Sequence, residues 1–183
     1  MIYFTADTHF CHGNIIGLCG RPFKDAEDMN MTLIRNWNAA VGKNDEIYII
    51  GDFLYKGDGK KANEILSRLK GKKYLIRGNH EKYLEDRQFD VRAFEWVKDY
   101  FVLHYQGTKI VLFHYPIIEW DGYFKGSVHL YGHVHNGPER NPALYEGFKA
   151  LGARAVNVGV EMHNYCPVSV NTIFEIIKRN ENK

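Results

Sequence analysis

Acidic, amide and histidine side chains follow five short apolar segments of this chain, at the point where each segment ends. Asp7 and His9 follow the IYFTA segment, and Asp52 follows EIYII. The other three segments are KYLI, KIVLF and VHLY, which precede Arg77-Gly78-Asn79-His80, His114 and Gly132-His133-Val134-His135. Apolar runs of this length, rich in Ile, Val, Leu, Tyr and Phe, are typical of buried strands. Because ligand sites form at the carboxyl ends of strands in open α/β sheets, these side chains are expected to converge on one sheet edge.

The donor atoms of this set point to transition-metal binding. Carboxylate and amide oxygens together with imidazole nitrogens suit Mn, Fe, Zn or Ni, and the set is too rich in nitrogen for calcium. Two cations held about 3.5–4 Å apart repel each other, so a carboxylate must lie between them, and a water that they share becomes a hydroxide nucleophile near neutral pH. The sequence therefore predicts a dinuclear metal centre, with Asp52 as the candidate bridging ligand.

Single-residue spacing links the candidate ligands in two pairs. Asp7 and His9 are separated by one residue, so on an extended segment both side chains would point to the same side and could bind one metal ion. His133 and His135 repeat this spacing. Three glycines stand before candidate ligands, where a side chain would block close approach of backbone, metal and substrate. These glycines are Gly51, Gly78 and Gly132.

Helical patterns connect the first three predicted strands. Residues 28–41 place Met31, Ile34 and Trp37 at three- and four-residue intervals, and Gly42 follows as a plausible C-cap. Residues 60–69 form a second amphipathic segment that stops at Gly71. The resulting β-α-β-α-β order predicts a parallel sheet.

The later part of the chain has a different pattern. A hairpin is predicted for residues 101–104 and 109–113, which flank a Gln106-Gly107-Thr108 turn. The later strands are therefore expected to be antiparallel. A strand over 155–158 and a helix over about 171–178 close the α/β fold.

Length and composition predict one domain that covers residues 1–183. The apolar fraction is 45% and the charged fraction is 25%, which is ordinary for a globular protein. The 24 basic and 22 acidic residues nearly cancel, and without a basic stripe a nucleic-acid partner is neither indicated nor excluded. The sequence says nothing of oligomeric state.

The amino terminus and the cysteines help to predict the cellular compartment of the protein. Met1 leads directly into a predicted strand, which leaves no room for a signal peptide, and no stretch approaches the roughly 20 apolar residues of a membrane span. A cytoplasmic protein that does not contact a membrane is expected. The three cysteines lack a CxxC spacing and are interpreted as small, mostly buried thiols. Cys11, which lies between His9 and His12, could alternatively be a metal ligand.

The ordered motifs resemble those of the calcineurin-like metallophosphoesterase superfamily. They are Asp7-x-His9, Gly51-Asp52, Gly78-Asn79-His80-Glu81, His114 and Gly132-His133-x-His135, in family order over residues 7 to 135. The resemblance implies a four-layer αββα sandwich with two metals at the edge where the sheets meet. It also implies one metal on Asp7, His9 and His135, the other on Asn79, His114 and His133, and Asp52 on both.

The resemblance further implies a catalytic role for His80. In the family, the matching histidine is not a ligand; it contacts the phosphate and is proposed to protonate the leaving group. Asp52 would contribute by bridging the metals, and Glu81 occupies the acidic position beside His80. The chain has no insertion large enough for a cap domain, so an open site is expected.

These features predict a metal-dependent phosphoesterase that hydrolyses phosphomonoester or phosphodiester bonds in small substrates. Two divalent transition-metal ions are the expected cofactors, with manganese first and iron, zinc or nickel as alternatives. The alternative functions are a nuclease of the same fold and a catalytically silent binding scaffold. A silent scaffold would be expected to have lost one or more ligands, and this chain has them all.

Substrate contacts are predicted at three further residues, which are His12, Arg21 and Arg77. Guanidinium groups match the oxygens of phosphate, although both arginines could instead form surface ion pairs, and His12 could pack at a helix start. Several aromatic residues after His114 could stack on a nucleotide base, but packing beneath a loop is the alternative. These are Tyr115, Trp120, Tyr123 and Phe124.

The remaining histidines are expected to be structural. His104 and His129 lie inside predicted strands, and His163 could reach the site only if its loop folds back.

Overall fold

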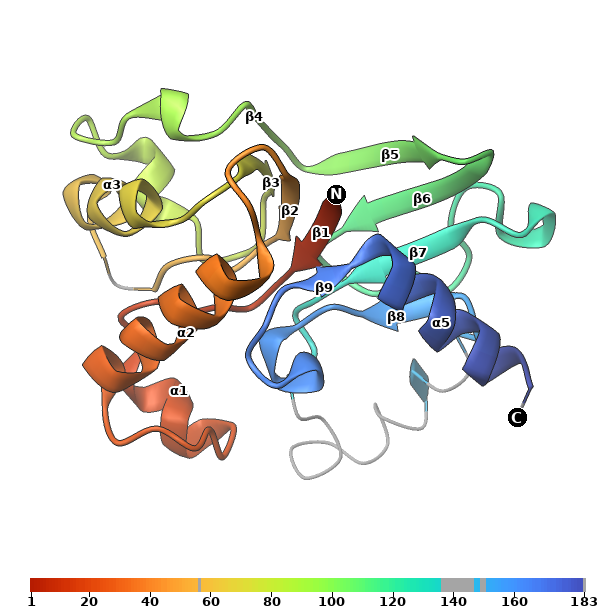
Figure 1. Ribbon diagram of the computed structural model, residues 1–183, viewed down its shortest axis with the longest axis horizontal. Coiled ribbons are helices and arrows are strands. Elements are labelled where there is room, and N and C mark those ends of the chain that lie inside the picture. The colour runs from red at the N-terminus through yellow and green to blue at the C-terminus, as the bar shows by residue number, and fades with distance from the viewer. Residues whose placement is uncertain (56, 136–146, 149–150, 183) are drawn as a thin grey trace.

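The computed structural model describes residues 1–55, 57–135, 147–148 and 151–182 (Figure 1). The first sheet has the strand order β4-β3-β2-β1-β9, and the pairs from β1 to β4 are parallel while β9 is antiparallel to β1. Its strands are β1 (Ile2–Thr5), β2 (Glu46–Ile50), β3 (Lys72–Ile76), β4 (Trp96–Lys98) and β9 (Val168–Ser169). The predicted parallel core therefore forms.

The second sheet has the order β5-β6-β7-β8. Strands β5 (Tyr100–Tyr105) and β6 (Thr108–Phe113) form the predicted antiparallel hairpin around Gln106-Gly107. The expectation that all later strands are antiparallel is wrong, because β7 (Val128–Tyr131) pairs in parallel with both β6 and β8 (Ala155–Asn157). The loops after β6 and β7 therefore leave the sheet at the same edge.

Two capped helices cross between the strands of the first sheet. Helix α2 (Ala26–Ala40) begins where the Asp25 carboxylate accepts the backbone N–H of Asp28, and α3 (Gly59–Arg68) begins at Asp58 in the same way. The buried face of α2 differs from the predicted one: Met29 and Leu33 are buried with Trp37, whereas Met31 is 55% exposed. Helix α2 ends without the glycine cap expected at Gly42, since its C-cap is Val41, and α3 ends at the C-cap Leu69, before Gly71.

Alternating residues of β2 face two separate cores. Ile47 and Ile49 pack towards α2 and α3, whereas Tyr48 and Ile50 point into the space between the two sheets. Helix α5 (Val170–Glu181) adds Ile173 and Ile177 to the second core and packs against β1, β8 and β9 (Figure 1). This arrangement of two mixed sheets with helices outside them agrees with the expected αββα sandwich.

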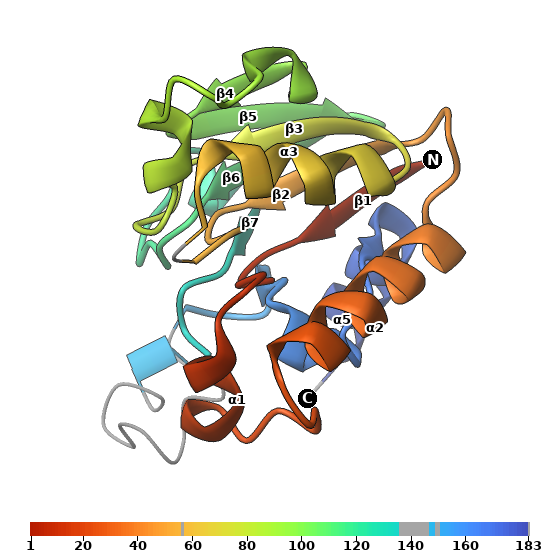
Figure 2. The same cartoon turned by 90° about the vertical axis from the view of Figure 1, so that its left-hand side faces the viewer.

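The structure contains short elements that the apolar pattern does not predict. Helix α1 (Gly13–Leu18) follows the loop that leaves the end of β1 (Figure 2). In the described part of the chain, 3-10 turns lie in loops at η1 (Lys82–Glu85), η2 (Val91–Ala93), η3 (Tyr123–Lys125) and η5 (Val160–His163). None of the helices in the described part of the chain has the length and apolar character that crossing a membrane requires.

Candidate metal centre

Hydrogen bonds beyond the strand ends hold side by side the loops that carry the candidate ligands. The backbone N–H of Asp7 donates to the Gly51 carbonyl, and that of His9 donates to the Asp52 carbonyl, each at 3.0 Å. In the second sheet, the N–H of Gly132 donates to the carbonyl of His114 at 2.9 Å. Parallel pairing therefore continues into the loops and brings their side chains together.

Four candidate ligands have left-handed backbone. The φ angles are 56° at Asp7, 48° at His9, 56° at Asp52 and 67° at His133. Residues other than glycine rarely adopt this conformation, and it costs of order 1–3 kcal/mol at each position unless the surroundings enforce it. The extended segment expected at Asp7 and His9 is therefore wrong: the two side chains converge through a contorted backbone and not through strand alternation.

The side chains form two groups of possible metal ligands. Donor atoms of Asp7, His9 and His135 lie within 4.8 Å of one another, and so do those of Asp52, His114 and His133. His133 and His135 belong to different groups, so their spacing does not aim both at one metal. The Asn79 Oδ1 atom joins the second group, 3.2 Å from His114 Nε2 and 3.0 Å from His133 Nδ1.

Asp52, a member of the second group, also faces the first group. Its Oδ2 atom is 3.4 Å from His9 Nε2, and its Oδ1 atom is 3.6 Å from His114 Nε2. A carboxylate that presents one oxygen to each group has the geometry that a bridging ligand needs.

Glycines make room for this packing. A Cβ atom at Gly132 would lie 2.6 Å from the Oδ2 atom of Asp7. Cβ atoms at Gly78 and Gly51 would clash with the Asp52 carboxylate and the His114 ring. All three glycines therefore stand where close approach to a candidate ligand requires them.

The donor set fits a pair of divalent cations. Asp7 is fully buried and Asp52 is 2% exposed, and burying carboxylates is costly unless positive charge compensates them. The His9 Nε2 atom is buried and lacks a hydrogen-bond partner in the described part of the chain. His114 directs Nδ1 at the Ile50 carbonyl at 2.9 Å, so a proton on Nδ1 leaves Nε2 available to a metal.

Burial also sets the charges of this cluster. It lowers the pKa of His9 to about 2, which keeps the imidazole in the neutral form that binds metals. Burial raises the pKa of Asp7 to about 7. Burial acts in the same direction on Asp52, but His114, His9 and His80 outweigh it and lower the pKa of this carboxyl to about 2.

A cleft of about 420 Å³ opens onto the cluster. His80 lines it together with the ligands, and the His80 Nε2 atom is 3.8 Å from Asp52 Oδ2. Tyr55 packs edge-on against His80, and its ring stacks on His12 with centroids 3.6 Å apart. Helix α1 supplies another part of the wall through Asn14, Ile15 and Leu18.

The two predicted substrate arginines do not line this cleft. Arg21 is buried, and its guanidinium donates to Glu161 and to the carbonyls of Asp7 and Thr8, so the expected alternatives of phosphate contact and surface ion pair are both wrong. Arg77 is exposed and lies 3.6 Å from the carboxylate of Asp99, which agrees with the surface ion pair. Of the three predicted substrate residues, only His12 lines the cleft.

Sequence reasoning missed two residues that contact the first group. Glu161 lies 3.0 Å from His135 Nδ1, and the Cys19 thiol lies within 4.8 Å of the donor atoms of both residues. Cys11, the thiol considered as a ligand, instead accepts a hydrogen bond from the Asn30 amide at 3.6 Å. Glu161 stands 26 residues after His135, outside every motif, so only the fold reveals the contact.

The other histidines have structural positions. His104 is exposed on β5, and His163 directs Nε2 at the Asn157 carbonyl at 2.9 Å. His129 is buried: its Nδ1 atom lies 3.2 Å from the Val111 carbonyl oxygen, and its Nε2 atom accepts the backbone N–H of Ile117 at 3.2 Å.

The aromatic residues after His114 differ in environment. Tyr115 packs edge-on against His133, and its ring centroid is 4.6 Å away. Trp120 is buried and donates to the Ser127 hydroxyl, whereas Phe124 is 83% exposed. Tyr115 is therefore the aromatic residue of this segment nearest to the candidate ligands.

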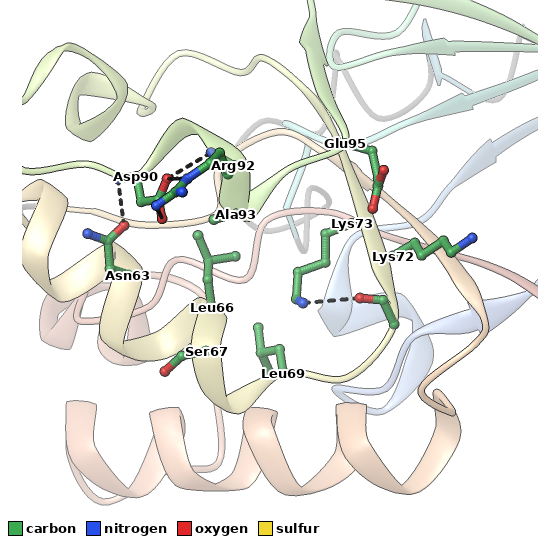
Figure 3. A pocket seen from close by; sticks show the side chains of 11 residues that line it. Asn63, Leu66, Ser67, Leu69, Lys72, Lys73, Asp90, Arg92, Ala93 and Glu95 are labelled. Carbon is green, nitrogen blue, oxygen red and sulfur yellow. Dashed lines mark hydrogen bonds and ion pairs between the residues drawn. The ribbon is translucent and has the colours of Figure 1, made fainter.

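A second cavity, of about 500 Å³, lies between α3, the start of β3 and η2 (Figure 3). Leucines form part of its wall, and three of its charged groups have local contacts: Lys73 donates to the Gly71 carbonyl, and Arg92 pairs with Asp90. It lies at the amino end of β3, whereas the candidate ligands follow the carboxyl end. The two sites are therefore separate.

Known proteins are similar to this chain in sequence or in structure. An uncharacterized protein of Methanocaldococcus jannaschii is 37% identical over 98% of this chain and 93% of its own length. The gene 66 protein of Mycobacterium phage D29 is 25% identical over 74% of the chain and 78% of its own length. A crystal structure of a protein of unknown function from Aquifex aeolicus superposes with a TM-score of 0.73 and 29% identity, over 96% of this chain and 98% of that one.

The sequence also matches a family model described as calcineurin-like phosphoesterase, over residues 1–137. This range contains all seven candidate ligands, and members of the family bind two metal ions. The chain therefore belongs to the calcineurin-like phosphoesterase family.

Proposed function

We propose that this protein is a metal-dependent phosphodiesterase. The observation that carries the proposal is the pair of ligand groups on either side of Asp52, at the base of an open cleft. In this proposal, Asp7, His9 and His135 would hold one metal, Asn79, His114 and His133 would hold the other, and Asp52 would be a ligand of both.

The protein's own residues have distinct roles in the proposed reaction. When bound, a pair of divalent ions supplies Lewis acidity that neutralises phosphate oxygens and makes water a better nucleophile near neutral pH. Asp52 fixes the distance between the two ligand groups. His80 lies beside them on the cleft wall, where its imidazole can donate a proton to the departing ester oxygen.

The cleft favours a diester over a monoester. The described residues that line the cleft include no lysine or arginine. A site for a doubly charged terminal phosphate would be expected to contain such cationic side chains. A diester carries one charge fewer at the phosphate and has a second organic group to place. The wall made by Ile15, Leu18 and Tyr55 offers apolar surface for that group.

Hydrolysis of bis-p-nitrophenyl phosphate and p-nitrophenyl phosphate tests this proposal. Metal-free protein would be reloaded in turn with Mn, Ni, Zn and Mg, and manganese is the expected metal. We expect metal-dependent turnover with a higher kcat/KM on the diester. Asp52→Asn serves as the control, because losing the bridging carboxylate should abolish the dinuclear centre and the activity.

Each other outcome has a defined meaning. A higher kcat/KM on the monoester would reverse the proposed preference. Two bound ions without turnover on either ester would favour a binding role, and an Asp52→Asn variant that still holds two ions would contradict the bridge.

A further inference from the structure

A buried ion pair lies directly behind the first ligand group. The side chains of Arg21 and Glu161 are 0% and 2% exposed, and the Nε and Nη2 atoms of Arg21 donate to Glu161 Oε1 at 2.9 and 2.6 Å. Burying two charges costs desolvation energy that their attraction often fails to recover. Stability alone is therefore a weak reason for this pair, and its contacts with the ligand loops suggest another.

The carboxylate of the pair determines how His135 presents its ring. His135 Nδ1 lies 3.0 Å from Glu161 Oε1, so a proton on Nδ1 is donated to the carboxylate and Nε2 is left for a metal. Carboxylates that hold a ligand histidine in this way fix both its tautomer and its orientation.

The guanidinium of the pair holds the backbone of the other two ligands. Arg21 Nη2 donates to the Asp7 carbonyl at 2.7 Å, and Nη1 donates to the Thr8 carbonyl at 3.0 Å. These carbonyls belong to the segment in which Asp7 and His9 have left-handed backbone. Such a backbone persists only where its surroundings enforce it, and two charge-assisted hydrogen bonds do so here.

The second ligand group meets the first through the backbone N–H of His133, which donates to the Asp7 carboxylate, but its other contacts lie elsewhere. His114 Nδ1 donates to the Ile50 carbonyl, and Asn79 Oδ1 lies within hydrogen-bonding distance of His114 and His133. Disrupting the ion pair should therefore affect the two metals unequally.

We propose that Arg21 and Glu161 are positioning residues for the metal that Asp7, His9 and His135 bind, and that they control the affinity of this metal and not of the other. The proposal rests on the ligand assignment in the proposed function. It explains why a buried arginine and a carboxylate distant in sequence meet beside one ligand group.

The test is a calorimetric titration of metal-free Glu161→Gln and Arg21→Gln with Mn²⁺. We expect one ion to bind roughly 10–100-fold more weakly while the affinity for the other changes little. Electron paramagnetic resonance at one added equivalent should then show mononuclear Mn²⁺. Unchanged affinities for both ions, or equal weakening of both in a variant whose metal-free form is folded, would overturn the proposal.

A double variant separates positioning from stability. Removing one partner of a buried pair is strongly destabilising, whereas apolar replacement of both partners is often neutral. The Arg21→Met, Glu161→Met double variant should therefore be as stable as the wild-type protein in urea with EDTA. We expect the first ion still to bind weakly to this variant, because His135 lacks its acceptor. Recovery of both affinities would show that the pair only stabilises the fold.

Asp99→Asn is the matched control. It breaks the exposed pair of Asp99 with Arg77 and should leave both affinities unchanged. Because the measurement is metal binding, its result is independent of catalysis: a wild-type protein that binds two ions without turnover contradicts the proposed function and leaves this test intact.

Discussion

His80 is the residue whose role most clearly differs from that of its neighbours. Its side chain is 33% exposed on the cleft wall, whereas those of His9 and Asp52 are 2% exposed. Its Nε2 atom faces the Asp52 carboxylate from 3.8 Å. This position on the cleft wall suits a group that meets the substrate.

The His80→Ala variant should still bind two metal ions. Its hydrolytic activity should fall more on esters whose leaving group requires protonation than on esters with a good leaving group. General acid catalysis typically contributes about 10²–10⁴-fold, so we expect a loss of this size on alkyl esters and a much smaller loss on p-nitrophenyl esters. Metal analysis and kcat on both ester types measure the effect. Full activity on an alkyl ester would contradict the proton-donor role.

Individual residues show how far sequence reasoning extends at this site. The seven candidate ligands could be predicted because each follows a strand in a spaced motif, and the fold gathers them as expected. The conformation of Asp7 and His9 could not, since left-handed backbone at an aspartate or histidine is unfavourable and arises only from tertiary contacts. The partner of Arg21 was equally inaccessible, because Glu161 lies 140 residues away.

At the scale of elements, the periodicity of apolar residues predicted the long helices and strands that have a buried face. The crossover helices, the parallel strands and the hairpin form as expected because apolar residues repeat with the period of each element. Strands β4 and β9 have three and two residues, too few to show a period, and α1 has one buried apolar residue. The exposure of Met31 has a different cause: Met29, Leu33 and Trp37 repeat at four-residue intervals on a neighbouring face of α2, and that face is the buried one.

Strand β7 gives the fold a specific sensitivity to acid through His129. Burial lowers the pKa of His129 from 6.5 to about 4, even though the carbonyls of Val111 and Tyr115 favour the charged form. As the pH falls below about 6.5, the unfolded chain binds a proton that the folded chain does not, so stability is lost until about pH 4. The full loss from this residue is on the order of 3 kcal/mol.

Urea unfolding of metal-free protein between pH 4 and pH 8 measures this effect. We expect His129→Gln to flatten the decline relative to the wild-type protein, because glutamine does not titrate in this range. His104→Gln, which replaces an exposed histidine on β5, is the control and should leave the profile unchanged. Parallel profiles for His129→Gln and the wild-type protein would contradict the assignment.

At the scale of the whole molecule, the metal centre lies where the two sheets meet. Asp7, Asp52 and Asn79 follow strands of the first sheet, while His114 and His133 follow strands of the second. Metal bound by both sets cross-links the two layers, and any ligand that binds only the folded state stabilises it by mass action.

Mn²⁺ at about 100 times its dissociation constant should therefore add about 2.7 kcal/mol to the free energy of unfolding for each site. For a chain of this size, one such site corresponds to roughly 5–10 °C in Tm. Calorimetric scans with Mn²⁺ and with EDTA measure the shift, and Asp52→Asn should show a smaller one. Identical Tm values with and without Mn²⁺ would contradict a centre that joins the sheets.

The left-handed backbone at four candidate ligands also bears on protein engineering. A designer who transferred the seven side chains to the ends of regular strands in another scaffold would reproduce their order but not their directions, since ordinary strands hold φ near −120°. The transferable unit is the contorted loops together with the glycines and the ion pair that hold them. A graft that omits these supports is expected to bind metal poorly even with every ligand present.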